Sequence, residues 1–77
     1  MSYDYVVWGQ PNCQYCDMAK KLLDSKGLTY QYKEIGSGYT KQDLLAEVPT
    51  ARSVPQILTG NGEYIGGYNN LKSQLDD

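Results

Sequence analysis

The first 35 residues of the chain carry the pattern that most constrains its fold. Residues 3–8 (YDYVVW) are rich in aromatic and β-branched side chains, and residues 9–12 (GQPN) break the run, as expected for a strand that leads into a loop. From Cys13 to Gly27 apolar side chains recur at helical spacing, and residues 28–35 (LTYQYKEI) alternate like a second strand. In a strand–helix–strand unit the helix crosses over the sheet, so the two strands are parallel, and this crossover is right-handed in about 98% of cases. The pattern therefore predicts an α/β fold.

The ends of this first helix have sequence signals of their own. Asn12 is a good N-cap, and Gly27 supplies the usual left-handed stop. We therefore expect the helix to begin directly after Asn12.

The second half of the chain predicts a short helix and a hairpin. Thr40 and Asp43 have the spacing of a capping box at the start of the helix. Residues 56–58 and 63–65 flank the turn sequence of residues 60–62 (GNG), and Asn-Gly is the strongest short-range hairpin signal. The last two strands are therefore predicted to be antiparallel.

Residues 68–75 predict a final helix that Asn69 or Asn70 caps. The predicted order is βαβαββα. A chain of 77 residues without repeats or linkers fits one domain over residues 1–77.

Both cysteines of the chain lie within residues 13–16 (CQYC), at the front of the first predicted helix. A disulfide across two intervening residues closes almost no loop, so it adds little stability. A closed zinc site needs four nitrogen or sulfur ligands, and one chain without histidine offers two, which leaves only a zinc site shared between chains. The pair is thus either redox-active or an inert pair of helix residues.

Redox chemistry would give the two cysteines different tasks. At a helix N-terminus the backbone N–H groups and the macrodipole stabilise a thiolate, and the pKa of such cysteines falls to roughly 3.5–7.5. Cys13 has this position, so we expect it to attack a disulfide sulfur. Cys16 lies one turn further in, on the apolar face. We expect Cys16 to attack the resulting mixed disulfide and release the partner.

Composition excludes several other classes of function. The net charge is −2 with acidic and basic residues interspersed, and no basic run predicts a nucleic-acid surface. No stretch approaches the roughly 20 apolar residues of a membrane span, and residues 1–4 lack the features of a signal peptide. We therefore expect a cytoplasmic protein without nucleic-acid or membrane partners.

Four stretches of the chain resemble the glutaredoxin family: residues 11–16 (PNCQYC), 19–28 (AKKLLDSKGL), 51–58 (ARSVPQIL) and 62–71 (GEYIGGYNNL). Together they cover nearly the full length. The resemblance implies a thioredoxin-like fold with a four-stranded mixed sheet flanked by helices. It also implies a groove beside the cysteines for glutathione.

Carried over position by position, the resemblance assigns five residues to this groove. Val54 would offer its backbone to glutathione, and Pro55 would follow a cis peptide bond. Without the resemblance, a trans proline at a sheet edge is the default. Gly66 and Gly67 match the family's glycine pair, where absent side chains let glutathione approach, although a plain turn also explains them. Tyr15 matches the family as well and would wall the groove with its ring.

Three other positions of the expected groove depart from the family pattern. Asn69 and Asn70 stand where many members have a hydroxyl or acidic residue and then an aspartate that meets the amino group of glutathione. Asparagine accepts a hydrogen bond but supplies no charge. Gln10 stands where many members have a lysine for a glutathione carboxylate, and Arg52 or Lys20 is the candidate to replace it. We therefore expect weakened affinity for glutathione.

The resemblance implies a dithiol enzyme that reduces protein disulfides and glutathione mixed disulfides through Cys13 and Cys16. Glutathione would be its co-substrate, with no tightly bound cofactor and no metal. Ribonucleotide reductase is a typical client of the family, and we expect an electron-transferring monomer. The alternative is a carrier in which two chains and two glutathiones bridge a [2Fe–2S] cluster through Cys13. A thioredoxin is disfavoured because the Trp-Cys-Gly-Pro-Cys pattern is absent.

Overall fold

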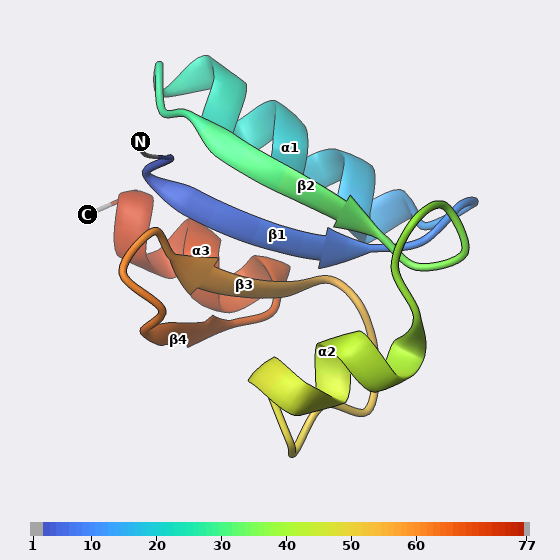
Figure 1. The fold of residues 1–77 in the computed structure, drawn as a ribbon. Helices are drawn as coiled ribbons and strands as arrows, with labels where there is room; N and C mark the ends of the chain where they lie inside the picture. The colour runs from blue at the N-terminus through green and yellow to red at the C-terminus, as the bar shows by residue number, and fades with distance from the viewer. Residues whose placement is uncertain (1–2, 77) are drawn as a thin grey trace.

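The computed structural model describes residues 3–76 and contains seven elements. Their order, βαβαββα, is the predicted one (Figure 1). The elements are β1 (Tyr5–Gly9), α1 (Gln14–Ser25), β2 (Tyr30–Glu34), α2 (Lys41–Glu47), β3 (Gln56–Thr59), β4 (Tyr64–Gly66) and α3 (Tyr68–Leu75).

The four strands form one mixed sheet in the order β2-β1-β3-β4. β1 pairs in parallel with β2, as the crossover helix requires, and antiparallel with β3. In this register Val7 lies opposite Tyr32 on one side and Ile57 on the other. β3 and β4 form the predicted antiparallel hairpin, with an irregularity between Ile57 and Leu58. The fold is therefore the four-stranded mixed sheet that the resemblance implied.

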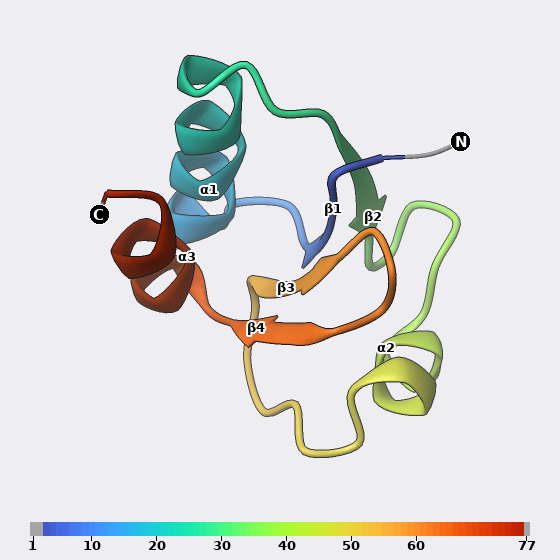
Figure 2. The same cartoon turned by 90° about the vertical axis from the view of Figure 1, so that its left-hand side faces the viewer.

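The helices cover both faces of the sheet. α1 and α3 lie against one face and α2 against the other (Figure 2). The carboxyl end of β1 and the start of β3 meet at one end of the sheet, because these two strands are antiparallel. α1 begins at this same end, and so does α3. The segments that precede α1, β3 and α3 are thereby gathered into one region.

Two apolar clusters hold the layers together. The first packs α1 and α3 onto the sheet, and its buried members are Val7, Ala19, Leu23, Ile57 and Leu71. The second packs α2 onto the opposite face, and its buried members are Trp8, Leu44, Val48 and Leu58. Val7 and Trp8 are neighbours in β1 and point to opposite faces, so this central strand supplies both clusters.

The N-cap of α1 is Cys13, so the prediction that Asn12 caps this helix is wrong. The Cys13 sulfur accepts the backbone N–H of Cys16 at 3.1 Å. Asn12 instead adopts a left-handed conformation, with φ of 59°, which asparagine tolerates better than most residues. The predicted stop at Gly27 is confirmed, because Gly27 has a φ of 71° just after the helix.

The predicted capping box of α2 is confirmed, since Thr40 and Asp43 each bond the other's backbone N–H. The predicted asparagine cap of α3 is wrong. Gly67 occupies the N-cap position without a side-chain cap bond, and Asn69 and Asn70 lie inside the first turn. The reason is that α3 begins at Tyr68, two residues after β4 ends.

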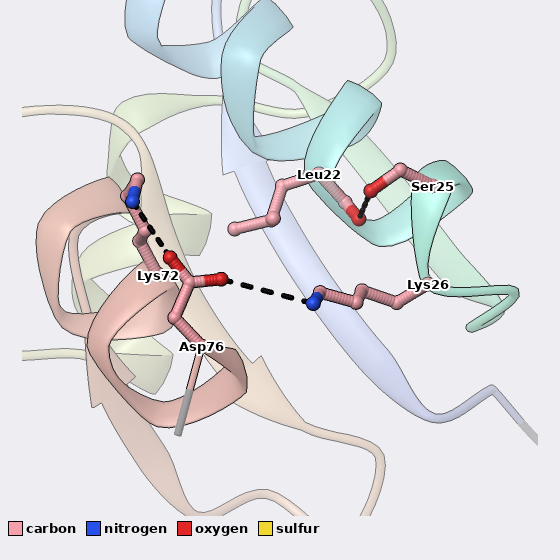
Figure 3. Close-up of polar contacts among 5 residues, drawn as sticks. All are labelled: Leu22, Ser25, Lys26, Lys72 and Asp76. Carbon is pink, nitrogen blue, oxygen red and sulfur yellow. Dashed lines mark hydrogen bonds and ion pairs between the residues drawn. The ribbon is translucent and has the colours of Figure 1, made fainter.

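A three-residue ion-pair cluster links the C-terminal ends of α1 and α3 (Figure 3). Asp76 receives the Lys72 ammonium at 2.6 Å and the Lys26 ammonium at 3.7 Å. The hydrogen bond from Lys72 and the two nearby cations hold the pKa of Asp76 below its usual range. In the same region the Ser25 hydroxyl donates to the Leu22 carbonyl at 2.7 Å.

Within the described residues, no helix has the length and apolar character needed to cross a membrane.

Candidate active site

Cys13 and Cys16 are joined by a disulfide, with their Cα atoms 5.2 Å apart. The two cysteines differ in access to solvent. Cys13 is partly exposed at the N-cap of α1, whereas Cys16, one turn into the helix, has no exposed surface. An incoming disulfide can therefore reach Cys13 but not Cys16, which supports the predicted order of attack.

The surroundings of Cys13 favour its thiolate over its thiol once the disulfide is reduced. The backbone N–H of Cys16 points at the Cys13 sulfur from 3.1 Å. The N-terminus of the 12-residue helix α1 adds the positive end of its macrodipole. Both features stabilise negative charge on the sulfur and make it a better nucleophile and leaving group near neutral pH.

The segment before β3 lies directly beside Cys13. The Cys13 sulfur is 4.0 Å from the Val54 carbonyl oxygen. The peptide bond between Val54 and Pro55 is cis, as the resemblance implied. Pro55 is buried, and Val54 is partly exposed and packs against the α2-side core cluster.

A cavity of about 490 Å³ opens on the α2 side of this segment. Three of the predicted groove residues line it together with Cys13, namely Gln10, Arg52 and Val54. Lys41, the first residue of α2, also lines it and was not predicted. Lys20 does not belong to this site. Its ammonium lies 4.0 Å from the centre of the Tyr32 ring and pairs with Asp17. Of the two predicted replacements for the missing lysine, Arg52 alone lines this cavity.

A second cavity, of about 300 Å³, opens on the α3 side of the same segment. Its walls are the rings of Tyr15 and Tyr68, whose centres are 5.9 Å apart. Tyr68 was not predicted as a site residue, because its sequence position indicated only that it begins the last helix. The other lining residues are Ser53, Val54, Pro55, Gly67, Asn69 and Asn70, of which all but Ser53 were predicted.

The two predicted glycines have different structural tasks. Gly66 has a φ of 126°, and a Cβ at this position would lie 2.8 Å from the Asn70 side-chain carbon Cγ. Gly66 is buried, lines neither cavity, and lets Asn70 pack over its backbone. A Cβ on Gly67 would meet only the Pro55 carbonyl oxygen, at an ordinary 3.7 Å. The structure thus requires glycine at position 66 but not at position 67.

A buried glutamine that sequence reasoning missed holds the segment beside Cys13. The side-chain amide of Gln56, which is 6% exposed, donates to the Ser53 carbonyl at 2.7 Å. Its side-chain oxygen accepts the Tyr64 hydroxyl, also at 2.7 Å. Ser53 and Val54 line both cavities and form the wall between them. The relay of hydrogen bonds from Tyr64 through Gln56 to Ser53 holds this wall in place. The one available signal was a polar residue directly before the apolar pair Ile57 and Leu58.

No group of three or more His, Cys, Asp or Glu side chains within residues 3–76 is arranged to hold a metal ion.

A four-stranded mixed sheet with a cysteine pair at the start of its first helix defines the thioredoxin-like class of folds. A solved thioredoxin-like protein shares this fold at 22% identity, with a TM-score of 0.73 over 95% of this chain and 99% of that one. The glutaredoxin family model matches residues 5–65. The chain belongs to the glutaredoxin family.

Two relatives show how far the similarity extends. A glutaredoxin of Ricinus communis is 40% identical over 65 residues, which cover 80% of this chain and 63% of that protein. The structure of a buckwheat glutaredoxin–glutathione complex is similar with a TM-score of 0.77 and 30% identity, over 97% of this chain and 70% of that one. The chain thus spans less than two thirds of its Ricinus relative.

Proposed function

We propose that this glutaredoxin is a thiol–disulfide oxidoreductase in which Cys13 attacks and Cys16 resolves. The observation that carries the proposal is the unequal exposure of two bonded cysteines, one at a helix N-cap and one fully buried. Family membership supports the same chemistry.

The cycle needs only sulfur chemistry. The Cys13 thiolate attacks one sulfur of a client disulfide, forms a mixed disulfide, and displaces the other client sulfur as a thiolate. The Cys16 thiolate then attacks the Cys13 sulfur and displaces the second client thiolate. The client gains two electrons, and the enzyme loses two as the Cys13–Cys16 disulfide forms.

We propose that glutathione closes the cycle. One glutathione thiolate opens the Cys13–Cys16 disulfide, and a second attacks the glutathione bound to Cys13, which yields glutathione disulfide and the reduced pair. Glutaredoxin potentials near −200 to −230 mV lie close to those of glutathione pools, so this exchange runs readily in either direction. The cationic lining of the α2-side cavity, which suits a carboxylate, and the similarity to a glutaredoxin solved with glutathione support this co-substrate.

The single-cysteine variants test the proposal. Cys13→Ser is expected to abolish all thiol transfer. Cys16→Ser is expected to retain removal of glutathione from small mixed disulfides and to lose most reduction of protein disulfides. Activity that survives in Cys13→Ser would refute the assignment of the nucleophile.

Cluster transport is distinguished by colour in the same preparations. Under the proposed function, anaerobic purification with glutathione gives a colourless active monomer. A brown dimer that bleaches as thiol-transfer activity appears would instead support the [2Fe–2S] carrier.

A further inference from the structure

The two cavities beside Cys13 differ sharply in charge. The α2-side cavity is lined by two cationic side chains, Lys41 and Arg52, and by no carboxylate. The α3-side cavity is lined by no charged side chain. The chain has seven lysines and arginines and a net charge of −2, so two of its seven basic residues line one cavity of an acidic protein.

The cations of the α2-side cavity are available to a substrate. Lys41 and Arg52 are both exposed, and neither forms an ion pair within residues 3–76. A carboxylate that enters this cavity meets two positive charges without displacing an existing partner. The glycine carboxylate of glutathione fits this requirement, and so does an aspartate or glutamate of a protein client. This cavity therefore selects for negative charge but does not distinguish the two.

The α3-side cavity does distinguish them. The γ-glutamyl group of glutathione carries an ammonium as well as a carboxylate. Asn69 and Asn70 offer it amide oxygens but no carboxylate, so the ammonium gives up water without gaining an ion pair. An uncharged side chain avoids this cost. The rings of Tyr15 and Tyr68 give an aromatic or aliphatic side chain an apolar surface, and the two amides can bond peptide groups.

The geometry allows one extended segment to use both cavities. Ser53 and Val54 line both of them, and the Val54 carbonyl lies 4.0 Å from the Cys13 sulfur. Consider a bound peptide that crosses this wall with its own cysteine at the Cys13 sulfur. The residues before and after the peptide's cysteine then lie toward opposite cavities. Each residue of an extended chain spans roughly 3.3 Å, so residues one or two positions from the cysteine are the ones that reach them.

We propose that the groove selects protein disulfides whose cysteine has an acidic residue on one side and an uncharged aromatic or aliphatic residue on the other. Such clients are preferred over glutathione mixed disulfides. This inference rests on the proposed thiol–disulfide exchange and specifies its substrate class.

Synthetic substrates with a common leaving group test the inference. Peptides with one cysteine, flanked by Glu and Phe, by Lys and Phe, or by Glu and Lys, are each prepared as mixed disulfides with 2-mercaptoethanol. The mixed disulfide of glutathione with 2-mercaptoethanol is the reference. Both orders of the flanking residues are made, because the direction of the bound segment is open. We expect kcat/KM for the best Glu/Phe peptide to exceed each other substrate by roughly five- to tenfold.

Variants assign the preference to the two cavities. Arg52→Glu is expected to remove most of the Glu-over-Lys preference, whereas Lys21→Glu, on an exposed α1 position outside both cavities, leaves it unchanged. Tyr15→Ala is expected to remove the Phe-over-Lys preference at the other position. Tyr3→Ala is the matched control, because Tyr3 is similarly exposed and lies outside the cavities.

Equal kcat/KM for Glu and Lys peptides, or faster turnover of the glutathione substrate, would overturn the inference and leave the proposed function intact. Loss of the preference in Lys21→Glu as large as that in Arg52→Glu would also overturn it. Inactivity toward every disulfide would instead overturn the proposed function, and this inference with it.

Discussion

Replacing Gln56 with methionine is expected to loosen the wall between the two cavities. Methionine has nearly the size of glutamine but can neither donate to the Ser53 carbonyl nor accept from the Tyr64 hydroxyl, both now at 2.7 Å. A typical internal hydrogen bond contributes about 1 kcal/mol, so the two together contribute about 2 kcal/mol to the free energy of unfolding. For a domain of this size that corresponds to a fall in Tm of roughly 8–16 °C.

The functional effect of Gln56→Met separates binding from chemistry. Ser53 lines both cavities, whereas Gln56 lines neither and does not contact the sulfur atoms. We therefore expect KM for disulfide substrates to rise while kcat changes little, as measured by steady-state kinetics below the Tm of the variant. An unchanged KM would refute the positioning role of Gln56.

Tyr64→Phe provides the matched control, because it removes only the outer bond of the relay. Tyr64 is 54% exposed, so water replaces its hydroxyl and the expected cost is only about 0.5–1 kcal/mol. On the Gln56→Met background the same substitution is expected to cost nothing further, because the bond is already lost. Fully additive effects in thermal unfolding would show that the two residues do not act as one relay.

Three further predictions concern other parts of the structure. Gly66→Ala is expected to lower the free energy of unfolding by about 1–3 kcal/mol, because φ is 126° there, while Gly67→Ala changes it little; equal effects in denaturant titrations would contradict the different roles of the two glycines. Asn70→Asp is expected to lower KM for a glutathionylated substrate, because it supplies the carboxylate that the α3-side cavity lacks, and an unchanged or higher KM would reject that explanation. Asp76→Asn is expected to lower Tm modestly at neutral pH. Since the pKa of Asp76 is lowered in the folded state, its contribution is complete above its unfolded pKa of about 4 and is lost as the pH falls through the lower folded value. The Tm difference between wild type and Asp76→Asn should therefore shrink as the pH falls below about 4 and also in high salt, and a difference independent of pH would contradict the ion-pair origin.

The order of the elements follows from the sequence because it depends on local periodicity. The helical spacing from Cys13 to Gly27 and the Asn-Gly hairpin signal are properties of short stretches, and the structure confirms both. The two wrong N-caps, Asn12 and the asparagines of α3, lie at helix starts next to the site. There the path of the chain from β1 and from β4, rather than residue preference, fixes the first helical residue.

Site residues could be predicted from the sequence only where the residue type itself has a distinctive reactivity or matches the family pattern. Cys13 and Cys16 were found because paired cysteines have a distinct reactivity, and the cis bond before Pro55 came from the family resemblance alone. Gln56 and Tyr68 could not be found in this way. Their roles arise from the three-dimensional contacts they make and not from their residue type. Gln56 bonds to Ser53 and Tyr64, and Tyr68 packs against Tyr15, which lies far away in the sequence.

The proposed mechanism requires that Cys13, and not Cys16, forms the bond to the substrate. Its most direct test is to react the reduced Cys16→Ser and Cys13→Ser variants with a small glutathionylated disulfide and to map the adducts by mass spectrometry of peptides. We predict stoichiometric glutathione on Cys13 in Cys16→Ser, formed rapidly near neutral pH, and almost none on Cys16 in Cys13→Ser, because Cys16 is fully buried. Rapid stoichiometric labelling of Cys16 would overturn the assignment of Cys13 as the attacking cysteine.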